Sequence, residues 1–98
     1  MATIELKDED GSPVRIASVE EMKAFIAKIE ARRDSLADRM LGSDVADARQ
    51  AEVLSDALED VYLPKLMDWV KIFNDKLEAE ATVSHRRAKA QAIKARTS

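Results

Sequence analysis

Few side chains of this sequence are of the types that carry out catalysis or hold a metal ion. The chain has no Cys and a single His, which excludes thiolate nucleophiles, thiolate zinc sites and a histidine dyad within one chain. His85 stands next to Arg86 and Arg87, whose positive charges would repel a metal cation. We therefore interpret His85 as a solvated or tail-packing side chain and predict no metal site.

Carboxylates are abundant, and several stand in pairs that invite an acid–base interpretation. Asp34 and Asp38 are four residues apart, as are Asp56 and Asp60, a spacing that places both members of a pair on one helix face. General acid–base catalysis needs such acids in a pocket that shifts their pKa values, and a thin helical protein offers little pocket. We predict a solvated acidic face, no cofactor and no enzymatic activity.

The segment 8–11 places three acids before a glycine, as some calcium-binding loops do. If Gly11 took the sixth position of an EF-hand loop, Leu6 would take the first and Ala17 the twelfth. Neither side chain is a calcium ligand, so the match fails. The segment is better explained as the turn of a β-hairpin that covers residues 3–17.

Alternating apolar and polar residues flank this turn and predict two short strands. Two registers compete. A two-residue turn at residues 10–11 would pair Leu6 with Arg15, whereas a three-residue loop over 9–11 places all four apolar side chains on one face. We favour the second register, with Gly11 in the left-handed conformation. Its pairs are Ile4 with Ile16, Leu6 with Val14 and Asp8 with Ser12.

Three helical segments follow, with predicted bounds of about 19–41, 44–62 and 64–84. Ser18 and Glu21 form a capping box at the first helix, and we predict Gly42 as its left-handed C-cap. Ser43 or Asp44 caps the second helix. Pro64 predicts a kink or a break near residues 62–63, and we favour a break that leaves Pro64 in the first turn of a third helix. The expected seam of the second helix is Val45, Ala48, Ala51, Leu54, Leu58 and Val61.

Length and composition favour one small helical domain. The 98 residues are 46% hydrophobic and 36% charged, and two Gly and two Pro are too few turn formers for an all-β fold. We predict a mainly α fold, with a short N-terminal hairpin followed by an antiparallel bundle of two to three helices, the last long and protruding. Residues 1–84 form the domain and 85–98 a basic helical extension. Without a membrane-length apolar run or a signal-peptide pattern, we expect a cytoplasmic protein.

The candidate partner-binding residues are apolar positions of the third helix. One seam, which includes Leu66 and Phe73, faces the expected core, and a second apolar stripe is shifted around the helix. Either the core uses both stripes, or the second stripe is a patch for self-association or for a partner protein. The candidate contact set is Tyr62, Leu66, Trp69, Ile72 and Phe73.

Arg33 interrupts the apolar seam of the first helix, and three interpretations stay open. Its side chain snorkels at the edge of the bundle, with the charge in water. Alternatively it pairs with an acid of another helix, or it marks the register of an intermolecular interface. The candidate acids for such a pair are Asp56, Glu59 and Asp60.

Charge is distributed unevenly along the chain. Residues 1–84 hold all 19 acids and 11 of the 16 bases, a formal charge of −8, whereas residues 85–98 hold five bases and no acid. Three interpretations of the basic end stay open. It is a soluble helix terminus whose positive charge complements the macrodipole, or it docks on an acidic surface such as the body of a second copy. Alternatively, it contacts nucleic-acid phosphates. The charged contact residues in question are Arg86, Arg87, Lys89, Lys94 and Arg96.

No motif assigns the chain to a family, so function is inferred from shape and charge. We predict a small non-enzymatic accessory protein, an interaction module that acts as assembly subunit, adaptor or inhibitor by packing helix faces together. Its expected partner is another protein or further copies of itself, and no membrane is involved. The alternative is a nucleic-acid-associated protein that uses the basic segment.

Overall fold

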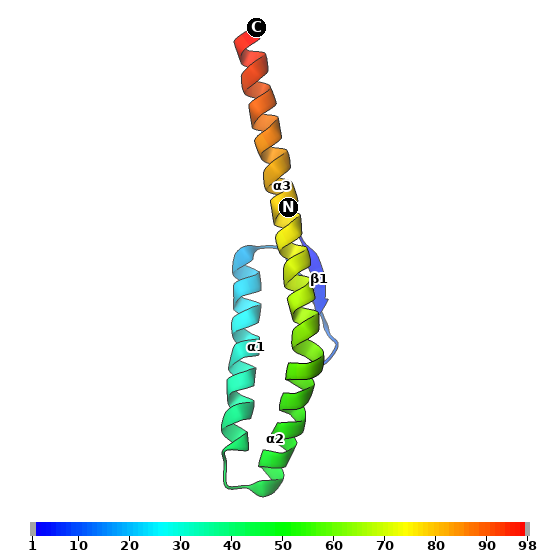
Figure 1. Cartoon of the computed structure of the whole chain (residues 1–98), viewed down its shortest axis with the longest axis vertical. Coiled ribbons are helices and arrows are strands. Elements are labelled where there is room, and N and C mark those ends of the chain that lie inside the picture. Colours follow the sequence, from blue (N-terminus) through cyan, green and yellow to red (C-terminus); the bar gives the residue numbers. More distant parts are fainter. Residues whose placement is uncertain (1, 98) are drawn as a thin grey trace.

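The computed structural model describes residues 2–97, and most of them are helical. A hairpin of β1 (Ile4–Lys7) and β2 (Pro13–Ile16) precedes α1 (Val19–Met40), α2 (Val45–Ala57), the π-helical turn η1 (Leu58–Tyr62) and α3 (Leu63–Thr97). α1 runs antiparallel to the long helix that follows it, the hairpin lies against one face of the pair, and the end of α3 projects beyond both (Figure 1). The molecule measures 76 × 19 × 17 Å. The predicted fold class is confirmed.

The hairpin has the predicted register. Ile4 pairs with Ile16 and Leu6 with Val14, so the apolar side chains share the face that packs on the helices. The Asp8 N–H donates to the Ser12 carbonyl at 2.8 Å, which closes the three-residue loop. Gly11 has a φ of 86°, a conformation that residues with a Cβ rarely adopt.

The ends of α1 agree with the predicted caps at one terminus and differ at the other. The Ser18 Oγ accepts from the Glu21 N–H at 3.1 Å, while the Glu21 carboxylate accepts from the Ala17 N–H at 2.7 Å, one residue before the position predicted. The prediction of a left-handed cap at Gly42 is wrong, since this residue does not have a positive φ. The chain instead ends in a tighter right-handed turn, in which N–H groups donate to carbonyls three residues back. The Gly42 N–H, for example, donates to the Arg39 carbonyl at 3.2 Å.

The predicted break at Pro64 is wrong, because α2, η1 and α3 form one continuous helical rod over residues 45–97 (Figure 1). The wider turn of η1 explains how the rod passes the proline. The Leu63 N–H donates to the Leu58 carbonyl, five residues back. This extra residue per turn relieves the clash that the Pro64 ring would make with the Asp60 carbonyl in a regular α-helix.

One buried cluster joins the hairpin, α1 and the long helix. Ala51 is fully buried where α2 packs closely on α1. Val45 and Val61, which we expected in the seam, are 71% and 56% exposed. The extra residue in η1 rotates the helix so that Tyr62, rather than Val61, follows Leu58 on the buried side. The buried set is Ala2, Ile4, Leu6, Ile16, Met22, Phe25, Ile29, Leu36, Ala51, Leu58, Tyr62, Leu66 and Phe73.

Candidate functional site

The predicted contact set divides between the interior and the surface. Tyr62, Leu66 and Phe73 are buried in one cluster with residues of the hairpin and α1. Trp69 is half-buried against that cluster, and Ile72 is 47% exposed. Only a small fraction of each of the three buried side chains is open to a partner. The chain's own core therefore uses the main seam and part of the second stripe, whereas Ile72 stays on the surface.

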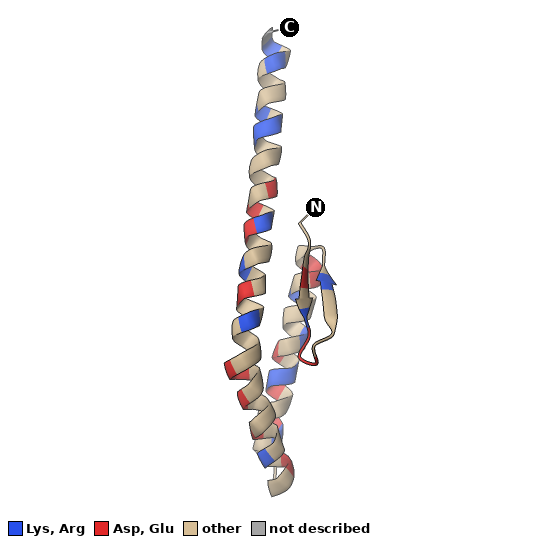
Figure 2. Cartoon of the chain, turned by 90° about the vertical axis from the view of Figure 1, so that its right-hand side faces the viewer, with Lys and Arg blue, Asp and Glu red and all other residues tan. Residues whose placement is uncertain are grey.

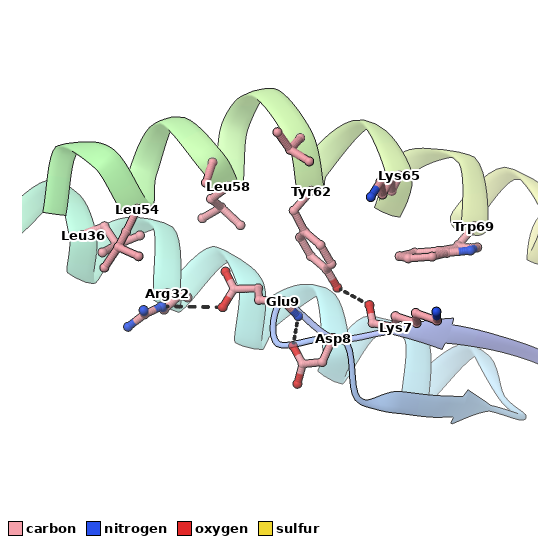
Figure 3. A pocket seen from close by; sticks show the side chains of 13 residues that line it. Lys7, Asp8, Glu9, Arg32, Leu36, Leu54, Leu58, Tyr62, Lys65 and Trp69 are labelled. Atoms are coloured by element: carbon pink, nitrogen blue, oxygen red, sulfur yellow. Dashed lines mark hydrogen bonds and ion pairs between the residues drawn. The ribbon is translucent and has the colours of Figure 1, made fainter. Parts of the chain in front are cut away.

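On the hairpin side, the second stripe lines a hollow of about 600 Å³. Leu36, Leu54 and Leu58 line its apolar end, whereas Tyr62 and Trp69 stand nearer β1 (Figure 3). The rings of Tyr62 and Trp69 meet edge to face, with centroids 6.2 Å apart. The Tyr62 hydroxyl donates to the Lys7 carbonyl at 2.9 Å, which ties the long helix to the end of β1.

The Tyr62 phenol in this hollow is not poised for acid–base chemistry near neutral pH. Burial, reinforced by the negative charges of Asp8 and Glu9, raises the pKa of Tyr62 to about 12. The phenol therefore stays protonated and serves as a hydrogen-bond donor to the strand. Its role here is to hold the hairpin in place.

The acids of the hairpin turn also hold the fold together. Lys28 of α1 contacts Asp8 at 2.8 Å. Arg32, one turn further on, lies 3.6 Å from Glu9 (Figure 3). The hydrogen bond from Lys28 lowers the pKa of the Asp8 carboxyl below its usual value. These pairs fasten the turn to α1. Across residues 2–97, no group of three or more His, Asp or Glu side chains is arranged to hold a metal ion.

A second hollow, of about 550 Å³, lies between α1 and α3 and is lined by residues of these two helices. We call it the α1–α3 groove. None of its lining residues belongs to the hairpin. Met67 stands at its edge with 71% of its surface exposed. The apolar lining is Ile26, Ile29, Leu63, Leu66, Met67 and Val70, and the polar lining is Glu30, Arg33, Lys71, Asn74 and Asp75.

Sequence reasoning missed this groove because two helices far apart in the chain form it. Met67 lay outside both stripes that we considered. The available signal was the spacing of Leu63, Met67 and Val70, which places a third apolar edge beside the main seam of the helix. On α1, Arg33 lines the groove and pairs with Glu59, the second of the three interpretations and one of its three candidate acids.

The five predicted basic contact residues all lie on the projecting end of α3. Every residue from 81 to 96 is exposed, so the projection begins a turn earlier than the predicted boundary at residue 85. This end of the helix carries Lys and Arg but no Asp or Glu (Figure 2). Within one chain, Arg86, Arg87, Lys89, Lys94 and Arg96 do not come together with the Trp69 region or with the α1–α3 groove.

Among the described residues, no helix combines the length and apolar character needed to cross a bilayer. No family model, curated protein or solved structure matches the chain.

Proposed function

We propose that this chain is a non-enzymatic protein-interaction module of the cytoplasm, an assembly subunit, adaptor or inhibitor, and that it binds through the α1–α3 groove. The observation that carries the proposal is an open apolar groove between α1 and α3, with Met67 largely exposed at its edge. Burial of its aliphatic lining against another protein would be favourable by about 25 cal/mol for each Å² removed from water.

The position of Met67 supports a protein as occupant. A long, unbranched and polarizable side chain adapts to the shape of an incoming helix, and such residues are frequent at binding surfaces of this kind. The groove is shallow, long and formed by two helices, which suits a third helix better than a compact small molecule. Acidic and basic residues line both walls, Glu30 and Arg33 on α1 and Asp75 and Lys71 on α3, and would set the orientation of the partner.

The test is the effect of a charge in the groove on association. We expect wild-type chain to have a solution mass by light scattering above the 10.9 kDa of one chain, and Met67→Asp to return it to that value. Val53→Asp is the matched control, because Val53 is 64% exposed on α2 and lines neither large hollow. Circular dichroism checks that both variants keep their helices. Equal association of all three proteins would contradict the proposal, as would a wild-type monomer that binds no apolar dye.

A second candidate function is contact with nucleic acid through the projecting end of α3. Five bases without an acid on an exposed helix favour it. Two features oppose it: this segment has no aromatic residue for base stacking, and the body carries a net negative charge. A titration of random DNA with salt separates the two functions. Affinity that falls steeply between about 50 and 200 mM salt would favour the nucleic-acid function, whereas near-zero affinity at low salt would remove it.

A further inference from the structure

We propose that the occupant of the α1–α3 groove is the projecting helix, residues 81–97, of a second copy of this chain. Two chains would then form a two-fold antiparallel dimer, in which each supplies one groove and one projecting helix. This inference rests on the proposed function, since it names the partner that the groove takes. Three independent features of the molecule lead to it.

The first feature is the surface that one chain leaves uncovered. The accessible surface is 7377 Å², whereas a compact monomer of 10.9 kDa exposes about 5,600 Å². The radius of gyration is 20.5 Å, against about 13 Å for a compact domain of this length. The surplus of about 1,800 Å² exceeds the roughly 800 Å² that each partner buries in a standard interface. A dimer that covers both the groove and the projecting helix would therefore have enough surface to be stable.

The second feature is the pattern of side chains on the projecting helix. At about 100° per residue, the side of α3 that carries Leu63 and Val70 beside the groove continues into the projection as an uncharged stripe. Most of its members are alanines, so another helix surface could approach closely. All five bases lie outside the stripe, and Arg96 is the nearest to it. The small uncharged members are Ala81, Ser84, Ala88, Ala92 and Ala95.

The third feature is charge. Two projecting helices laid side by side would bring five positive charges against five, which opposes a dimer built from the projections alone. The body of the chain has a formal charge of −8, and each wall of the groove carries one acid and one base, Glu30 and Arg33 on α1 and Asp75 and Lys71 on α3. A basic helix is therefore attracted to the body of the other copy, and the attraction selects the antiparallel arrangement over the parallel one.

Length and symmetry agree with this arrangement. The projection over 81–97 is about 25 Å long, and the wall of the groove over 63–75 on α3 is about 20 Å long. If the two long helices cross where the body ends, near residue 80, Ala92 of one copy comes level with Asp68 of the other, one residue from Met67. The two-fold axis repeats the contact, so both grooves are filled and no open-ended chain of copies results.

Disulfide cross-linking tests the contact directly, because the chain has no cysteine of its own. Met67→Cys protein is mixed with Ala92→Cys protein that carries a size tag, and the mixture is oxidised mildly. We expect the mixed covalent dimer to be the main product. Leu41→Cys, at the far end of α1, replaces Met67→Cys in the control and should give at least tenfold less mixed dimer. A disulfide between two copies of the Met67→Cys protein as the main product would overturn the proposal. So would a yield of mixed dimer no higher than in the control.

A pair of alanine substitutions tests the stripe. Ala88→Trp places a bulky ring on the stripe, whereas Ala90→Trp places the same ring on nearly the opposite side of the helix. We expect Ala88→Trp to weaken dimerisation at least tenfold by sedimentation equilibrium, and Ala90→Trp to change it less than twofold. Equal effects of the two variants would overturn the inference.

The failure of this inference is distinguishable from that of the proposed function. If Met67→Asp abolishes association while Ala88→Trp leaves it intact, the groove is an interface but its occupant is not the projecting helix. If neither variant changes association, both proposals fall. Salt-sensitive binding of random DNA, lost when the five bases are replaced and accompanied by no cross-link, would assign the projection to nucleic acid instead.

Discussion

The two faces of the α1–α3 pair differ in what covers them. On one face the hairpin lies over aromatic side chains, and the Tyr62 hydroxyl donates to the β1 backbone. On the other face the lining is aliphatic, and Met67 is largely exposed. The aromatic stripe, which drew attention as a possible binding surface, is thus largely satisfied within the chain. The comparison shows that aromatic residues of a helix can be used within the chain while an aliphatic edge on the other face stays exposed.

The largest expected effect is a difference between the two faces in how much a substitution lowers the free energy of unfolding. Phe73 is fully buried beneath the hairpin side, so Phe73→Ala should lower the free energy of unfolding by about 3–5 kcal/mol. Met67→Ala, on the open face, should lower it by about 0.5 kcal/mol or less when measured on the single chain. Urea denaturation at low protein concentration measures both. Similar losses for the two variants would show that the open face is covered in the single chain as well.

The link between the hairpin and the long helix gives a smaller effect. Tyr62→Phe removes the donor to the Lys7 carbonyl and keeps the ring, so we expect a loss of about 1 kcal/mol in urea denaturation. Amide exchange of β1 and β2 should speed up in this variant, while exchange in the middle of α1 changes little. Uniformly faster exchange would mean that the hydrogen bond does not act on the hairpin in particular.

Alkaline pH should weaken the stabilisation that comes from the hydrogen bond between Tyr62 and the Lys7 carbonyl. The pKa of Tyr62 is raised from 10.0 to about 12 in the folded chain, so the unfolded state loses this proton first. The corresponding stability is fully present below about pH 10 and is lost as the pH rises to about 12. The urea midpoint of wild type should therefore fall further across this window than that of Tyr62→Phe. Parallel curves for the two proteins would contradict the assigned cause.

The smallest expected effect on stability comes from the contact between the hairpin turn and α1. The pKa of Asp8 is lowered, chiefly by the hydrogen bond from Lys28, so its stabilising contribution is present above about pH 3.8 and is lost as the pH falls through the lower folded value. Asp8→Asn should cost less than Tyr62→Phe, because water and salt screen an exposed pair. Asp10→Asn, whose carboxylate bonds within the turn, is the comparison variant. Equal acid sensitivity of wild type and Asp8→Asn would remove the Lys28 pair as the cause.

The features that sequence reasoning predicted correctly depend on neighbours along the chain. Alternation about the turn specified which of two registers the hairpin adopts, and Gly11 marked the residue with a positive φ. Ser18 marked the start of α1, and of the two candidate caps for α2, Ser43 and Asp44, the structure uses Asp44. Such signals are reliable because a side chain that bonds a backbone group two or three residues away needs no help from the rest of the fold.

The errors at Pro64 and Gly42 have different causes, and at Pro64 packing against distant segments decided the outcome. Pro64 is a strong local signal for a break, yet the π-helical turn before it keeps the rod continuous while Tyr62 packs against β1. At Gly42 the error has a local cause: this residue would tolerate a left-handed conformation, but N–H groups that donate to carbonyls three residues back close the end of α1 in a right-handed turn. Local propensities at a position such as Pro64 differ by a few kcal/mol at most, and burial of a stripe of side chains can exceed that.

By itself the sequence determined the helical character, the hairpin with its register, and the separation of an acidic body from a basic end, because composition, alternation and charge order are properties of neighbouring residues. Only the tertiary structure decided which side of α1 and α3 the hairpin covers and where the groove with Met67 opens. That choice depends on contacts between residues far apart in the chain, whose combined burial no single stretch of sequence contains.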